Sequence, residues 1–118
     1  MQARVFIWYS HPLFARAMEG LMRREGMVIV GTSGEAVEAV PAILRQRPDV
    51  VVADRIVERE YPLGIAEIIR ACQRIRVLVL DLIEDYMRIY DGQGGAAGQL
   101  DAIVEAIEQA VPHVAPAA

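Results

Sequence analysis

The stretch Arg47-Pro48-Asp49-Val50-Val51-Val52-Ala53-Asp54 decides the fold. Its apolar run, with Pro48 before it and an acid after it, predicts a strand that is buried on both faces, as the strands of parallel sheets are. Asp54 then stands at the carboxyl end of that strand, where open α/β sheets place their reactive groups or ligands. The sequence therefore predicts an α/β fold with a candidate site at Asp54.

The segments on either side repeat this alternation. Apolar patterns predict strands at 4–9, 27–30, 49–53 and 76–82, and helices from Pro12 to Gly26, around 37–47 and at about 63–72. Residues 31–34, Gly-Thr-Ser-Gly, are predicted to form a turn. Pro41 costs about 3 kcal/mol in a helix interior, so the second helix is expected to be kinked or to begin late. This alternation favours a parallel sheet with helices on both faces.

Length and composition indicate the broad class. The chain has 118 residues, 54% of them hydrophobic, which suits one domain with one core. No apolar stretch approaches the ~18 residues of a membrane span, and the amino terminus lacks a signal-peptide pattern, so we expect a cytoplasmic protein without membrane contact. A net charge of -4 argues against direct nucleic-acid binding. The single Cys72 is expected to be buried rather than reactive.

Lysine is missing from the sequence, and all 12 basic residues are Arg. This excludes mechanisms that need a lysine ammonium, such as Schiff-base chemistry or a phosphate-loop lysine. Ser10 and His11 stand before Pro12, where they are expected to cap a helix rather than act as nucleophile and base. We therefore expect neither catalysis nor a bound cofactor or metal.

Three runs resemble the receiver domain of bacterial response regulators, the regulators of two-component systems, and are most similar to its NarL/LuxR-like branch. They are 5–14, ending in His-Pro-Leu-Phe, 47–54, and 76–80 with the sequence Arg-Val-Leu-Val-Leu. The resemblance covers about residues 4–82 and the last helix. It implies a CheY-like, flavodoxin-like open sheet with strand order 2-1-3-4-5.

The resemblance also implies roles for single residues. In that family, magnesium is bound by an acidic pair and by the aspartate after the third strand. The same aspartate accepts a phosphoryl group. A Thr or Ser and a Lys then contact that phosphoryl group. Asp54 matches the phosphoacceptor. Tyr9 and Ser10 replace the acidic pair with neutral oxygens, which suit magnesium poorly. Asp81 takes the Thr/Ser position, where an anion repels a phosphoryl group. Phosphoryl transfer depends on these charges, so we predict a pseudo-receiver.

The segment after residue 82 departs from the family, because it is too short for the helix that family members carry between their fourth and fifth strands. A parallel crossover needs about a dozen residues, whereas Ile83-Glu84-Asp85 suits a hairpin turn, so the strand at 86–90 is predicted to run antiparallel. It is expected to be a half-exposed edge strand that forms the interface to a protein partner or, in a homodimer, to a second copy. The candidate interface residues are Tyr86, Arg88 and Tyr90 on one face, and Met87 and Ile89 on the other.

The rest of the chain is predicted from local composition. Residues 91–98 are rich in glycine and are expected to form a flexible connector. A last helix follows, and its apolar stripe comprises Leu100, Ile103, Val104, Ile107 and Val111. The domain is expected to span 1–112, with a disordered tail at 113–118.

Two alternatives stay open. In the first, a residual switch operates, in which Asp54 is phosphorylated or shares a proton or a cation with Asp81. In the second, the chain is a small-molecule binding module that uses the carboxyl edge of the sheet near Tyr9, Asp54 and Asp81. The sequence does not identify the partner, the pathway or the geometry of a dimer.

Overall fold

A computed structural model describes residues 2–81, 83–92 and 94–98 of the chain. It contains one six-stranded sheet with strand order β2-β1-β3-β4-β5-β6. The strands are β1 (Arg4–Trp8), β2 (Val28–Ser33), β3 (Val50–Asp54), β4 (Arg76–Asp81), β5 (Tyr86–Asp91) and β6 (Gly94–Gly98). The helices are α1 (Pro12–Arg24), α2 (Ala36–Gln46), α3 (Arg55–Glu60) and α4 (Pro62–Ala71).

The sheet has two halves of different direction. β2, β1, β3 and β4 pair in parallel, and β4-β5 and β5-β6 pair antiparallel. The predicted order 2-1-3-4-5 and the predicted antiparallel hairpin are both confirmed. Turn residues 83–85 stand where a crossover helix would otherwise be needed, and Asp85 takes a positive φ of 50° there.

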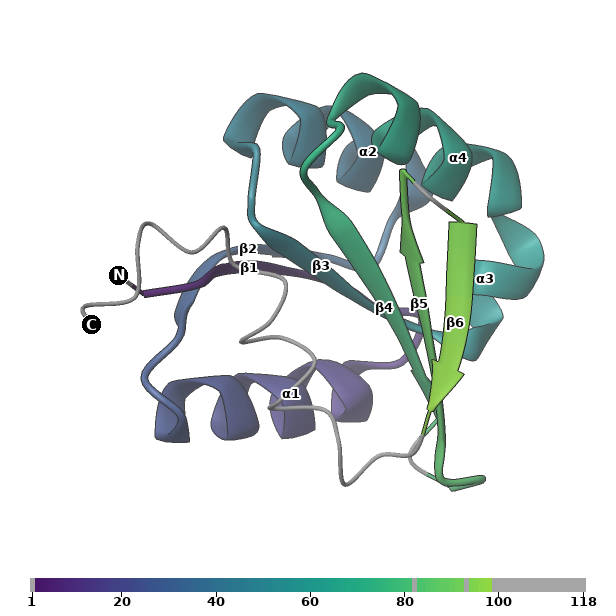
Figure 1. Cartoon of the computed structure of the whole chain (residues 1–118). Coiled ribbons are helices and arrows are strands. Elements are labelled where there is room, and N and C mark those ends of the chain that lie inside the picture. Colours follow the sequence, from purple (N-terminus) through teal and green to yellow (C-terminus); the bar gives the residue numbers. More distant parts are fainter. Residues whose placement is uncertain (1, 82, 93, 99–118) are drawn as a thin grey trace, which may run out of the picture.

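The helices of the described residues cover the two faces of the sheet unequally (Figure 1). α1 lies on one face, and α2, α3 and α4 lie on the other. Residues of β3 alternate between the two cores: Val50 and Val52 pack on the α1 side, and Val51 and Ala53 on the opposite side. All four are fully buried, which explains the unbroken apolar run. Trp8 packs in the second core at 1% exposure.

The helix termini follow the local sequence closely. His11 caps α1, because its Nδ1 accepts a hydrogen bond from the Leu13 amide, as expected. α2 begins at Ala36 and contains Pro41, so of the two alternatives expected from this proline, a kink or a late start, the late start is wrong. Its carboxyl end stops at Arg47 in the left-handed region, next to Pro48, and the Arg4 guanidinium donates to the last carbonyls.

Three expectations for segments are corrected. Gly31 belongs to β2 rather than to a turn, and a Cβ there would lie 2.7 Å from the Phe6 ring, so glycine is needed for close packing. Residues 94–98 form β6 rather than a flexible connector, because their backbone pairs with β5. That pairing removes β5 from the edge of the sheet. α3 was not predicted, since its six residues carry no apolar stripe.

The predicted last helix and the tail at 113–118 lie outside the described residues. Within the described part of the chain, no helix is long and apolar enough to span a membrane. Cys72 is buried at the end of α4, as expected from its apolar neighbours.

Candidate functional site

Asp54 lies at the carboxyl end of β3, and its carboxylate is hydrogen-bonded through both oxygens. Oδ2 accepts hydrogen bonds from the Ser10 backbone N–H at 2.6 Å and the Ser10 hydroxyl at 2.7 Å. Oδ1 accepts from the Val57 backbone N–H at 3.0 Å, which caps α3. The residue is 8% exposed. The sequence predicted its place, and the structure adds that both oxygens are occupied.

The donors to Asp54 come from Ser10 and Val57. Ser10, one of the two residues predicted to replace the acidic pair, donates to Asp54 from its hydroxyl and its amide, which links the segment after β1 to the end of β3. Magnesium prefers about six oxygen ligands, several of them anionic or water. The described residues contain no group of three or more side chains that could hold a metal ion. The donor set does not fit magnesium.

Tyr9, the other residue predicted to replace the acidic pair, takes no part in these hydrogen bonds to Asp54. A Cβ on Gly34 would lie 2.8 Å from the Tyr9 ring, so the ring packs closely against that loop. Tyr9 is half-buried and packs against the α1-side core. Of Tyr9 and Ser10, the structure therefore brings only Ser10 to Asp54.

Asp81 closes β4 and organises the hairpin turn. Its Oδ1 accepts from the backbone amides of Ile83 at 3.0 Å and Glu84 at 3.1 Å. Its Oδ2 lies 3.8 Å from the Arg55 guanidinium. No hydrogen bond joins Asp81 to Asp54 among the described residues, so a shared proton has no support from this geometry.

Arg55 is a site residue that sequence analysis missed. It follows Asp54 directly, pairs with Asp81 and stacks over the Tyr86 ring, with 4.4 Å from its Cζ to the ring centroid. Arg55 therefore supplies a cation at the carboxyl edge of the sheet, in a chain that has no lysine. The only signal in the sequence is its place next to Asp54, since the contact with Tyr86 is long-range.

A cleft of about 620 Å³ opens at this edge between the start of α1, α3 and the hairpin turn. Asp54, Arg55 and Asp81 line it together with exposed apolar side chains, among which Leu13 is 66% and Ile83 is 92% exposed. Tyr9 is not among its lining residues. Clefts of this size with apolar walls and a few polar groups are typical ligand sites.

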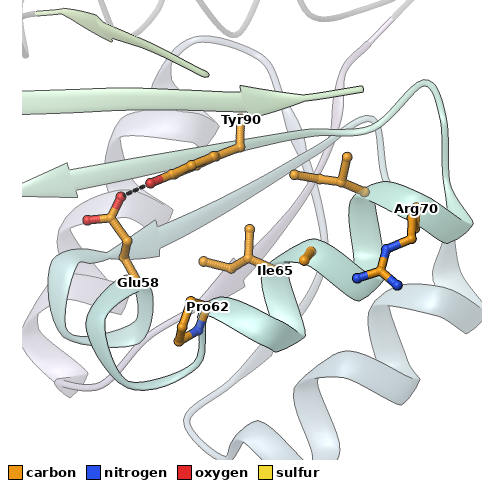
Figure 2. A pocket seen from close by; sticks show the side chains of 7 residues that line it. Glu58, Pro62, Ile65, Arg70 and Tyr90 are labelled. Atoms are coloured by element: carbon orange, nitrogen blue, oxygen red, sulfur yellow. Dashed lines mark hydrogen bonds between the residues drawn. The ribbon is translucent and has the colours of Figure 1, made fainter. Parts of the chain in front are cut away.

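A second hollow, the α4–β5 groove, lies on the opposite face of the sheet from α1 and has a volume of about 320 Å³. We define it by its lining residues Glu58, Pro62, Ile65, Ala66, Ile69, Arg70 and Tyr90. Figure 2 shows Glu58 and Pro62 at one end, Arg70 at the other and the Tyr90 ring above α4.

Tyr90 joins β5 to α3 at this groove. Its hydroxyl donates to Glu58 Oε2 and accepts from Arg88 at 3.2 Å, and Arg88 lies 3.6 Å from the same carboxylate oxygen. Two effects raise the pKa of the Tyr90 phenol above its ordinary value of 10.0. The larger is desolvation by burial, and the next is the hydrogen bond to Glu58. On the candidate interface face, Tyr90 and Arg88 are therefore bonded to each other and to Glu58, whereas Tyr86 contacts Arg55 and Arg88 through its ring.

The fold is that of a response-regulator receiver domain, an α/β sheet of order 2-1-3-4-5, here with an added sixth strand. No model of a known protein family matches the chain, and no curated protein matches it.

Solved structures do match. The receiver domain of the Erythrobacter litoralis PhyR response regulator is similar over 66% of this chain and 61% of that one, with a TM-score of 0.57 and 24% identity. A mutant form of the Bartonella quintana anti-anti-sigma factor PhyR matches over 67% of this chain and 33% of that one, with a TM-score of 0.59 and 23% identity.

The same Bartonella quintana factor in complex with anti-sigma factor NepR matches over 94% of this chain and 48% of that one, with a TM-score of 0.60 and 17% identity. The chain therefore spans less than two thirds of the length of each of these proteins. At these identities the likeness establishes the fold.

Proposed function

We propose that this protein is a pseudo-receiver of the NarL/LuxR-like kind that transmits information through protein contacts without phosphorylation, in a bacterial cytoplasm. The single observation that carries the proposal is the bonding of Asp54. Both of its oxygens accept hydrogen bonds from Ser10 and Val57, and the side chain is buried.

Phosphorylation of Asp54 has strong physical obstacles here. An attacking oxygen would have to leave its hydrogen bonds, and the developing negative charge would lack the metal and the lysine that stabilise phosphoryl transfer. Asp81 adds a second anion at the same cleft, although Arg55 partly compensates it. Catalysis is accordingly not part of the proposed function.

A protein partner is supported by the structural neighbours. One of them is an anti-anti-sigma factor that was solved in complex with an anti-sigma factor. A partner of a comparable regulatory kind, or a second copy of the chain, would contact the side of the sheet that carries β5. We expect the partner to contact side chains on a face of β5 and not its backbone edge, because the outer backbone groups of β5 already pair with β6.

The experiment is an amide NMR titration of the full chain with magnesium and then beryllofluoride, a mimic of the phosphoryl group, with Asp54→Asn as the matched control. We expect no saturable shifts at Ser10, Asp54 or Val57 in either protein. Saturable shifts that are present in wild type and lost in Asp54→Asn would contradict the proposal and support the residual switch.

The carboxyl-edge cleft supports a second candidate function, the binding of a small apolar molecule. The specific observation is that the exposed apolar side chains Leu13, Ile56 and Ile83 surround this cleft of about 620 Å³. Mass spectrometry of the natively purified chain would test it. A co-purified compound that Leu13→Asp releases would support this function, and a ligand-free chain in several preparations would argue against it.

A further inference from the structure

The α4–β5 groove exists because the sheet changes direction at the hairpin. A parallel β5 would have required a crossover helix over this face, whereas the turn at 83–85 makes that helix unnecessary. α4 packs on α2 on one side. On its other side, toward β5, it borders the groove.

The groove-facing residues of α4 form a regular helical stripe. Pro62, Ile65, Ala66, Ile69 and Arg70 follow the spacing i, i+3, i+4, i+7 and i+8, which places them on one side of a helix. Ile65 is buried, whereas Ala66 and Ile69 are half-buried. The small Ala66 at the centre of the stripe leaves room for a second helix to approach to the usual ~8–10 Å between axes.

The charges of the groove are self-complementary. Arg70 stands at one end and has no ion-pair partner among the described residues. Glu58 stands at the other end, and its Oε2 alone takes part in the bonds to Tyr90 and Arg88. If two copies pack antiparallel, Arg70 of each one faces the Glu58 end of the other. In a parallel pair, the two copies of Arg70 would instead face each other, and their like charges would repel.

We propose that the α4–β5 groove binds α4 of a second copy of this chain, antiparallel, with Ala66 at the two-fold axis. This rests on the proposed function, which requires contact with a partner protein, and it names that partner as the chain itself. The interface is isologous, so each substitution acts twice in the dimer.

The first test is the mass of the full chain in solution, measured by light scattering or sedimentation over a concentration series. Wild type is expected to be a dimer. Ala66→Arg is expected to raise the dissociation constant at least about 100-fold, because a long cation then stands on the axis, and Arg70→Glu about tenfold. Val37→Arg, at an 85% exposed position of α2, is the matched control and should stay dimeric.

The second test uses single cysteines under mild oxidation and depends little on folding stability. Ala66→Cys should cross-link two copies, since a residue on the axis meets its own counterpart within the roughly 4.4–6.8 Å that the Cα atoms of a disulfide require. Leu63→Cys, on the same helix and 80% exposed, should not cross-link efficiently. Arg70→Cys should not cross-link either, because antiparallel packing separates the two copies of this residue.

Three results would overturn the inference: a monomeric wild type, a dimer that Ala66→Arg leaves intact, or efficient cross-linking through Arg70→Cys. A monomeric wild type would indicate that the partner of the groove is a different protein. None of these results bears on the titration at Asp54, so failure of the dimer and failure of the pseudo-receiver proposal are distinguishable.

Discussion

The parallel and antiparallel halves of the sheet are stabilised in different ways. In the parallel half, β3 lies between two helical layers and its residues 50–53 are fully buried. In the antiparallel half, β5 is mostly half-buried, and Tyr90 and Arg88 bond to Glu58 of α3. Apolar packing therefore dominates one half, and polar contacts dominate the half-buried face of β5 that carries Arg88 and Tyr90 in the other. The five predictions below probe this difference.

Trp8→Ala should have the largest effect. Trp8 is 1% exposed and packs so tightly that a Cβ on Gly64 would lie 3.1 Å from its ring. We expect a loss of about 3–5 kcal/mol in the free energy of unfolding, from lost burial and a residual cavity. Urea denaturation measures it, with Leu63→Ala as the exposed control. A loss below about 1 kcal/mol would show that the parallel half is not the stability core.

Asp54→Ala should cost about 2–4 kcal/mol, because it removes the cap of α3 and leaves the Ser10 amide without its acceptor. Asp54→Asn should cost less, since its amide oxygen can still accept from Val57. The same denaturation experiment checks both. Equal stability of wild type and Asp54→Ala would contradict a structural role for this carboxylate.

Tyr90→Phe should cost about 1 kcal/mol, because Glu58 loses a hydrogen-bond donor in a partly buried position. Tyr86→Phe is the matched comparison on the same strand and face. The Tyr86 hydroxyl is buried without a hydrogen-bond partner among the described residues.

Removal of the Tyr86 hydroxyl should therefore leave the free energy of unfolding unchanged within about 0.5 kcal/mol or raise it slightly. Thermal or urea denaturation of both variants side by side measures the contrast. A larger loss for Tyr86→Phe than for Tyr90→Phe would contradict the bonding pattern described for this face.

Asp81→Asn should change stability by less than about 0.5 kcal/mol, because the amide oxygen can still accept from the turn and the Arg55 pair is half-exposed and long. The effect should shrink further in high salt. Denaturation at low and at high salt measures it, and a loss comparable to that of Asp54→Ala would show that the two acids are equivalent.

The pH dependence of the Tyr90 contribution should be the smallest effect. The folded chain raises the pKa of this phenol above 10.0, so the proton is held more tightly in the folded state. The resulting stabilisation is present below pH 10 and is lost as pH rises through the raised pKa. The stability difference between wild type and Tyr90→Phe should therefore narrow above pH 10. Denaturation of both proteins between about pH 8 and pH 11 measures this difference in the free energy of unfolding. A difference that does not change with pH would contradict the predicted role of the Tyr90 proton.

Much of the fold follows from local sequence. The run Val50–Ala53, the cap before Pro12 and the shortness of 83–85 predict the buried strand, the start of α1 and the antiparallel hairpin, and all three are confirmed. The position of Asp54 at the carboxyl edge is confirmed for the same reason, because a strand end is visible as the end of an apolar run.

The corrected expectations share a different cause. Residues 94–98 contain only Gly and Ala and carry no strand pattern, so their pairing with β5 depends on the neighbouring strand. Gly31 looks like a turn residue until the Phe6 ring is placed beside it. Neither contact can be predicted from composition, because each depends on how a neighbouring strand is placed.

The sequence by itself determined the alternation of strands and helices, the absence of lysine and the edge position of Asp54, since periodicity and residue type are local properties. Only the tertiary structure decided what Asp54 does. Ser10 is 44 residues away from it, and Glu58 is 32 residues from Tyr90. Contacts over such separations depend on the packing of whole elements, which brings the donors to the carboxylate and leaves α4 beside an open groove.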